Sequence, residues 1–197
     1  MSERIMGPGR LEAFSDGVIA ILITIMVLEL HVPATHEPAA LIGLWPVFVS
    51  YLLSFLVIAI YWVNHHGLFH QCREVNNAVL WTNMAFLFCI SLIPFATAYM
   101  GENRFTPFAT ALYGASLLLA GLSFVPMRKA VERQFAHDPD YRRVGRRVAI
   151  KNYVSIALYA ASVPLAFVHP AITLALAYIV AAIYFLPNAW IGEPDKP

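Results

Sequence analysis

Six apolar stretches, each about twenty residues long, dominate this sequence. A helix needs roughly 20 mostly apolar residues to cross about 30 Å of hydrocarbon, and each stretch reaches that length. Only 13% of the residues are charged and 59% are hydrophobic, against roughly 25% charged in an average soluble domain. We therefore predict an all-α integral membrane protein, a six-helix bundle forming one domain over residues 1–197. The predicted spans are residues 11–31, 43–66, 77–100, 107–127, 149–168 and 171–190.

Basic residues set the predicted orientation. With the N-terminus in the cytoplasm, 12 of the 13 Lys and Arg residues lie on the cytoplasmic side, and Arg104 alone lies outside. This is the pattern of the positive-inside rule, so both termini are predicted to be cytoplasmic. The expected location is a cell membrane, the inner membrane of a bacterium, crossed several times. The basic residues of the connection 128–151 are expected to fix the orientation of the chain in the membrane and to contact anionic lipid, so no nucleic-acid partner is expected.

Cysteines and prolines refine this picture. Cys72 and Cys89 are predicted at different depths, too far apart for a disulfide, so we interpret both as packing residues. Pro94 and Pro164 lie inside predicted spans, where proline kinks a helix. The long connection 128–151 is expected to extend the two flanking helices.

The first span has one mostly apolar face. At about 100° per residue, six of its residues fall within about 40 to 60° of a single line down the helix. These are Phe14, Gly17, Ile21, Thr24, Ile25 and Leu28. The stripe carries one hydroxyl, that of Thr24, in its middle.

Polar groups lie on the other side of the same helix, near its cytoplasmic end. Asp16 points about 140° away from the stripe, and Ser15 is also off it. Charges at this depth cost kilocalories and are kept where they are paired or useful. Donors at matching depth are available in the second and third spans: Trp62, Asn64, His65, His66, His70 and Asn83. We predict a structural cluster in which Asp16 is buried against Trp62, His65 or Asn83.

At these residues the chain resembles a known family. The pattern R-x-x-x-F-S-D from Arg10 to Asp16, followed by Ala20, Ile21 and Thr24, is similar to the signature of the transmembrane protein 175 family, potassium channels of endolysosomes and bacteria. The likeness extends to Trp62, His65 and His66, and to Asn83 with the stretch 92–95. It covers the first half of the chain well. The resemblance implies a homotetramer of six-helix subunits, with the first helices lining a four-fold pore. It also implies no TVGYG-type filter, and this sequence contains none.

The resemblance also implies residue roles. Ile21 matches the isoleucine of the hydrophobic constriction, Thr24 matches the threonine linked to selectivity, and Ile25 and Leu28 match further apolar layers of the gate. The signature cluster, whose expected role is to hold the pore helix against the second and third helices, comprises Arg10, Phe14, Ser15, Asp16, Trp62, His65, His66 and Asn83.

Two charged residues on the first helix leave alternatives open. The helical wheel puts Arg10 near the pore line, so it either precedes the regular helix after residues 7–9 or folds back to Asp16. Glu29, near the outer mouth, either concentrates cations or is an interfacial carboxylate in water.

The resulting hypothesis is a leak-type channel that is weakly selective for potassium over sodium. A narrow apolar collar strips part of the hydration shell, which costs potassium less than sodium. The expected partners are copies of the chain itself, the lipid bilayer and permeant potassium ions, with no cofactor.

Two other functions compete with this hypothesis. His65, His66 and His70 form an HHxxxH pattern that suits a membrane metalloenzyme, but such enzymes need more ligands, so neither a metal nor catalysis is expected. A proton-coupled transporter or proton-permeable channel would use Asp16 with these histidines as a relay. Transporters usually show inverted repeats, and we find no internal repeat.

Overall fold

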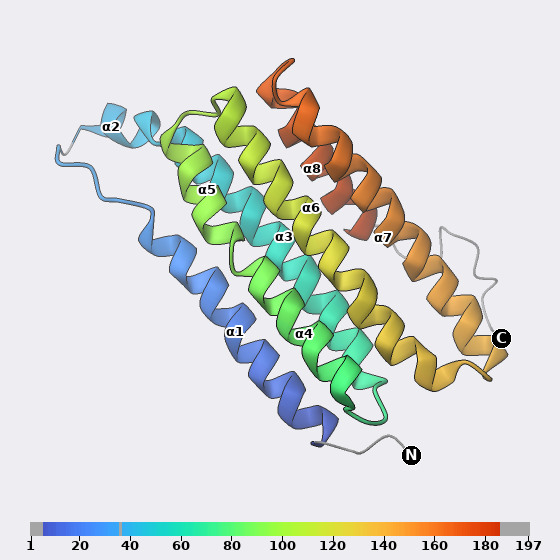
Figure 1. Ribbon diagram of the computed structural model, residues 1–197. Helices are drawn as coiled ribbons and strands as arrows, with labels where there is room; N and C mark the ends of the chain where they lie inside the picture. Colours follow the sequence, from blue (N-terminus) through green and yellow to red (C-terminus); the bar gives the residue numbers. More distant parts are fainter. Residues whose placement is uncertain (1–5, 36, 186–197) are drawn as a thin grey trace, which may run out of the picture.

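Most of the part of the chain that the structure describes is helical. The computed structural model describes residues 6–35 and 37–185, with the backbone alone at 139–144 (Figure 1). One isolated bridge joins Met6 to Val75. The elements are α1 (Pro8–Leu28), α2 (Pro38–Gly43), α3 (Trp45–His70), α4 (Asn77–Ile90), α5 (Ile93–Glu102), α6 (Pro107–Glu132), η1 (Arg133–Phe135), α7 (Pro139–Leu165) and α8 (Pro170–Phe185).

Proline marks where most of these helices begin. Helices α1, α2, α3, α5 and α6 all have proline at one of their first two positions, and α7 and α8 begin at Pro139 and Pro170. Proline suits these positions because its missing N–H has no partner there and its φ is already helical. Helix α4 uses a polar cap instead: Asn76 Oδ1 accepts a hydrogen bond from the Val79 amide at 3.0 Å.

The lengths of the helices confirm the predicted class of membrane protein. Among the described residues, five helical segments are long and apolar enough to cross a membrane, with α4 and α5 together forming one of them, and α8 is a shorter apolar helix. The last predicted span, 171–190, overlaps α8, but residues 186–190 lie outside the described residues.

The boundaries differ from the predicted ones in polar regions. Helix α3 continues to His70, α6 continues to Glu132, and α7 begins at Pro139, ten residues before the predicted span. Backbone hydrogen bonds continue through polar residues beyond the apolar stretch, so hydropathy underestimates these helices. Pro94 coincides with the break between α4 and α5, whereas Pro164 lies at the last turn of α7 and ends that helix rather than kinking its middle.

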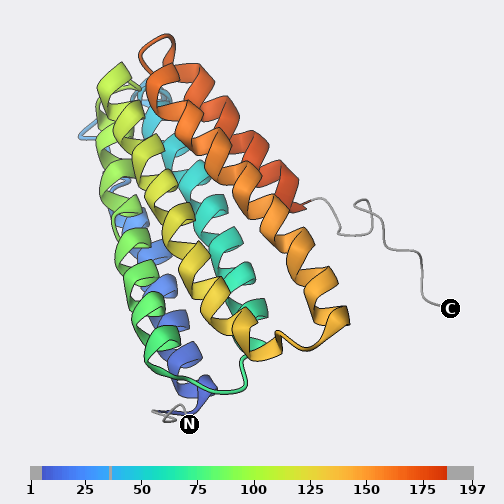
Figure 2. The same cartoon turned by 45° about the vertical axis from the view of Figure 1, so that its right-hand side comes forward.

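The helices pack side by side around α6, which contacts α3, α4, α5, α7 and α8. Helix α1 lies at one edge, packed on α3, α4 and α5, and α7 and α8 lie at the opposite edge (Figures 1 and 2). The backbones of α5 and α3 approach each other closely at Gly101 of α5, where an added Cβ would lie 2.9 Å from the Cα of Val47 in α3. Cys72 and Cys89 are buried and free, as predicted.

A group of hydroxyls lies inside this core, and the sequence analysis did not predict it. The Oγ atoms of Ser54 and Thr97 lie 2.7 Å apart, and Ser54 Oγ donates to the Tyr113 hydroxyl at 3.0 Å. All three side chains are buried. Helices α3, α5 and α6 are thereby joined by hydrogen bonds, which satisfy polar groups that lipid and apolar side chains cannot.

Candidate functional site

Helix α1 has a buried face and an uncovered face. The buried side chains are Leu11, Ser15, Ile19, Leu22 and Met26. The uncovered face is the apolar stripe read from the sequence. Of its large side chains, Phe14 is 53% exposed, Ile21 57%, Ile25 41% and Leu28 73%. A single subunit therefore leaves much of the surface of this stripe exposed.

The stripe carries one hydroxyl, which is already engaged as a donor. Thr24 is exposed, and its Oγ1 donates to the carbonyl of Ile21 at 3.0 Å. Because the proton points back to the helix, the oxygen lone pairs remain available to accept. An acceptor in this position suits a cation or a water molecule.

On the buried side, a chain of hydrogen bonds connects α1, α4 and α3. Ser15 Oγ donates to the carbonyl of Leu11 at 2.8 Å and accepts from Asn83 Nδ2 at 3.0 Å. Asn83 Oδ1 lies 2.8 Å from His65 Nε2, and Ser15, Asn83 and His65 are all fully buried. Since the amide oxygen can only accept, His65 carries a proton on Nε2. Its Nδ1 has no hydrogen-bond partner among the described residues.

Asp16 occupies a separate, half-buried position next to this chain. Trp62 Nε1 donates to Asp16 Oδ1 at 2.9 Å, so Trp62 is its partner among the three predicted donors. His65 and Asn83 bond to each other, and Asn83 bonds to Ser15 instead of Asp16.

Glu12 is a member of this region that the sequence analysis left out of the cluster. Its Oε1 lies 2.9 Å from His66 Nδ1, and the His66 ring stacks on Trp62 with ring centroids 5.5 Å apart. The signal was present in the spacing: Glu12 and Asp16 are four residues apart on α1, and Trp62 and His66 are four apart on α3. Residues four apart share a helix face, so the two pairs meet.

The position of Arg10 fits neither of the two alternatives left open for it, because among the described residues no ion pair joins its side chain to Asp16. Helix α1 begins at Pro8, so Arg10 lies inside its first turn and does not precede the helix. Its side chain is exposed and lines a shallow hollow with Phe14, Leu80 and Met84, at the edge between α1 and α4.

In the part of the chain that the structure describes, two trios of side chains have spacing that suits a metal ion. Glu12, Asp16 and His66 form one, and Glu29, His31 and Glu102 form the other; in each, the ligand atoms lie within 4.8 Å of one another. The second trio lies where α1 ends, and Glu29 and Glu102 also line a hollow between α1 and α5. Three ligands leave room for water in a zinc-like site. His70 belongs to neither trio, so the HHxxxH pattern does not converge on one point.

Comparisons with known proteins bear on this arrangement. Residues 10–94 match the family model described as the endosomal/lysosomal potassium channel TMEM175. The chain is 38% identical, over 97% of its length and 99% of the relative, to "Potassium channel HX13_20290" of Chryseobacterium sp., and 32% identical over 44% of its length, but 20% of the relative, to the human "Endosomal/lysosomal proton channel TMEM175".

Solved structures show the same architecture. A TMEM175 homolog from Chamaesiphon minutus, described as a lysosomal potassium-selective channel homolog, aligns with a TM-score of 0.76 and 28% identity over 90% of this chain and 95% of that one. A variant of the potassium channel MtTMEM175, solved in complex with a nanobody fusion protein, aligns with a TM-score of 0.66 at 16% identity, over 94% of this chain and 91% of that one. The second likeness concerns the fold alone.

Proposed function

The chain belongs to the TMEM175 family of potassium channels, and from this premise we propose that it forms a leak-type potassium channel, weakly selective over sodium, in a bacterial inner membrane. In this proposal four copies assemble around a central axis, and each contributes α1 to the pore wall. Both termini are cytoplasmic, and the whole chain acts as one membrane domain. The proposed channel uses no cofactor and no resident metal.

The observation that carries this proposal is the uncovered stripe of α1 with its single hydroxyl. One subunit has no enclosed path along α1, because the stripe is an open surface among the described residues. Four such stripes facing each other enclose one. Ile21, Ile25 and Leu28 then form successive apolar rings, of which we propose that Ile21 is the narrowest.

A ring of isoleucines controls ions through the energy of hydration. An ion in a narrow apolar collar loses part of its hydration shell, and no carbonyls replace it. Potassium holds its shell less tightly than sodium, so it passes at a lower cost. A slightly tighter collar would expel water and close the pore.

We propose that Thr24 adds selectivity one turn farther along the helix. Its hydroxyl proton is engaged by the Ile21 carbonyl, so its oxygen faces outward as an acceptor. Four such oxygens would partly replace the lost water ligands. Glu29, at the end of α1, would raise the local cation concentration.

The polar contacts of α1 support a structural role for Ser15 and Asp16, not a role in lining the pore. Ser15 and Asp16 engage α4 and α3 through Asn83 and Trp62, on the side of α1 away from Ile21. We propose that these residues fix the pore helix against its own subunit and do not contact permeant ions. Arg10 and Phe14 lie at the exposed cytoplasmic entrance.

A second candidate function is proton permeation. The contact of Glu12, Asp16 and His66 favours it, since these groups lie together and the His66 side chain is half exposed. The human relative is named a proton channel. The trio lies near one end of α1, so it would act as an entry for protons.

Flux from liposomes distinguishes these functions. Purified protein is reconstituted, and potassium, sodium and proton flux are measured under the same gradient, with native mass measurement of the assembly. We expect a tetramer, with potassium flux above sodium flux. Flux from a monomer or dimer would contradict the pore model, and proton flux without potassium flux would favour the second function.

A further inference from the structure

A groove with a basic lining lies on the side of the bundle opposite α1. It has a volume of about 280 Å³ and runs between α3, α7 and α8, with Val63, Asn64, Lys151 and Phe185 in its wall. A second hollow of about 230 Å³ shares Val63 and Asn64 with it. We call these two connected hollows the α3–α7–α8 groove. Together they are large enough for part of a lipid-sized ligand.

Each of the two hollows has one buried basic side chain in its wall. Arg128 on α6 lines the second hollow and Lys151 on α7 lines the first, and both side chains are more than nine-tenths buried. Arg128 pairs with Glu132 at 2.6 Å, and Glu132 is the one acidic residue among the described residues that line the two hollows. In the described lining, basic side chains therefore outnumber acidic ones by two to one. Buried basic groups between helices at a membrane edge are typical of sites for anionic lipid headgroups.

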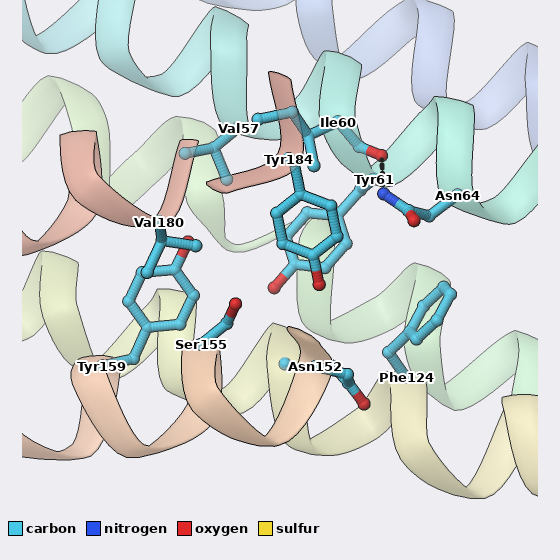
Figure 3. A pocket seen from close by; sticks show the side chains of 11 residues that line it. Val57, Ile60, Tyr61, Asn64, Phe124, Asn152, Ser155, Tyr159, Val180 and Tyr184 are labelled. Carbon is cyan, nitrogen blue, oxygen red and sulfur yellow. Dashed lines mark hydrogen bonds between the residues drawn. The ribbon is translucent and has the colours of Figure 1, made fainter. Parts of the chain in front are cut away.

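Two buried polar atoms, one on Arg128 and one on the residue that follows Lys151, have no hydrogen-bond partner among the described residues. They are Nε of Arg128, a donor, and Oδ1 of Asn152, an acceptor; the two residues are 3% and 4% exposed. An unmet donor fits a phosphate oxygen, and an unmet acceptor fits a hydroxyl or a water. Asn152 also lines a small inner cavity of about 20 Å³, enough for one water molecule. Figure 3 shows the hydroxyls of Tyr61, Tyr184 and Ser155 turned toward the same inner space.

The groove also has exposed apolar side chains in its wall. Val63 is 59% exposed and Phe185 is 66% exposed, and both lie in its wall. An acyl chain can lie along such a wall without burying polar groups. Arg128 directly follows a predicted span and Lys151 lies near the start of another, so both basic side chains are expected at the depth of the lipid headgroups. Figures 1 and 2 place α7 and α8 far from α1, so a channel lined by α1 would leave this groove facing lipid.

We propose that the α3–α7–α8 groove binds one anionic phospholipid of the cytoplasmic leaflet. Its phosphate is bound by Lys151 and by the guanidinium edge of Arg128, a headgroup hydroxyl reaches Asn152 directly or through one water, and one acyl chain lies past Val63 and Phe185.

Native mass spectrometry of the detergent-purified protein tests this site. Phosphatidylglycerol, phosphatidylcholine and inorganic phosphate are titrated in separate arms, and the dissociation constant of each adduct is measured. Phosphatidylglycerol should bind tighter than phosphatidylcholine, and inorganic phosphate should not displace it at millimolar concentration. Equal binding of the two lipids, or displacement by phosphate alone, would overturn the proposal.

Matched variants locate the site. Lys151→Gln should weaken phosphatidylglycerol binding by about fivefold, the effect of one basic residue near an anionic lipid surface. Lys129→Gln removes the same charge from an exposed position next to Arg128 and should leave binding unchanged. Val63→Trp fills the groove from an exposed position, keeps the fold and every charge, and should also weaken binding. Equal losses in Lys151→Gln and Lys129→Gln, or normal binding by Val63→Trp, would refute the assignment.

Discussion

Replacing Asn83 by leucine tests whether the hydrogen-bond chain between α1, α4 and α3 stabilises the bundle. Asn83 is fully buried, and its amide bonds both to Ser15 on α1 and to His65 on α3. Leucine has a similar shape and no polar atoms. The substitution therefore removes both hydrogen bonds while filling nearly the same space.

The expected loss follows from which groups stay satisfied. Ser15 keeps its bond to the Leu11 carbonyl, so its hydroxyl proton stays engaged. His65 Nε2 loses its acceptor, and an orphaned buried donor costs about 1 to 3 kcal/mol. Interhelical hydrogen bonds in bilayers average about 0.6 and reach about 1.7 kcal/mol, because the separated helices find other partners. We expect a loss of about 1 to 2 kcal/mol in the free energy of unfolding, a factor of roughly 5 to 30 in the equilibrium.

Unfolding in mixed micelles by added SDS, followed by far-ultraviolet circular dichroism, measures this free energy. Thr82→Val is the control, because Thr82 is a partly exposed residue of the same helix whose hydroxyl bonds to the Ala78 carbonyl within that helix. It should change stability by no more than about 0.5 kcal/mol. Adding His65→Leu to Asn83→Leu should recover part of the loss, since removing both partners costs less than removing one. Equal stability of Asn83→Leu and Thr82→Val would refute the reasoning.

Four further substitutions test the pore and the packing. Ile21→Asn should wet the collar, raise current in bilayer recordings and weaken potassium preference; unchanged conductance and selectivity would exclude α1 as the pore helix. Thr24→Ala should keep conduction and lower the potassium-to-sodium permeability ratio, and an unchanged ratio would remove Thr24 from the selectivity mechanism. Asp16→Ala should lower the stability of the assembly by about 0.5 to 1.5 kcal/mol in SDS titration, because the partly exposed indole donor loses its acceptor; normal assembly with altered selectivity alone would place Asp16 in the pore. Gly101→Ala should destabilise the bundle by about 1 to 3 kcal/mol, since its Cβ would lie 2.9 Å from backbone of α3, whereas Gly67→Ala, with nothing within 4 Å, should not; equal melting temperatures would contradict this packing.

Periodicity predicted the two faces of α1 correctly because α1 is one regular helix from residue 8 to residue 28. Regular geometry turns sequence spacing into angle, and Ile21, Ile25 and Leu28 on the predicted line are exposed, although Val27, about 120° from Ile21, is exposed as well. The lengths of the apolar stretches predicted a membrane protein correctly, because the thickness of the hydrocarbon layer sets the length of a membrane-spanning helix.

Contacts between helices were less accessible from the sequence. The choice of Trp62 over His65 as the donor to Asp16 depends on the rotation of α3 about its own axis, which hydropathy does not determine. The Ser54 and Thr97 contact joins residues 43 positions apart, and neither residue stands out from other hydroxyls in the spans. The groove beside Lys151 depends on how α3, α7 and α8 pack against one another, which hydropathy does not determine either.

The polar groups of α1, and not its apolar stripe, determine which face of this helix is left uncovered. In a bilayer an apolar side chain gains little from choosing protein over lipid tails, so hydrophobicity alone does not orient a helix about its axis. Polar groups do, because an unmet hydrogen bond in hydrocarbon costs several kilocalories. Ser15 and Thr24 are nine residues apart, as are Glu12 and Ile21, and nine residues correspond to roughly 180° on a helix. When Glu12 contacts His66 on α3 and Ser15 contacts Asn83 on α4, Ile21 and Thr24 are therefore turned to the opposite side.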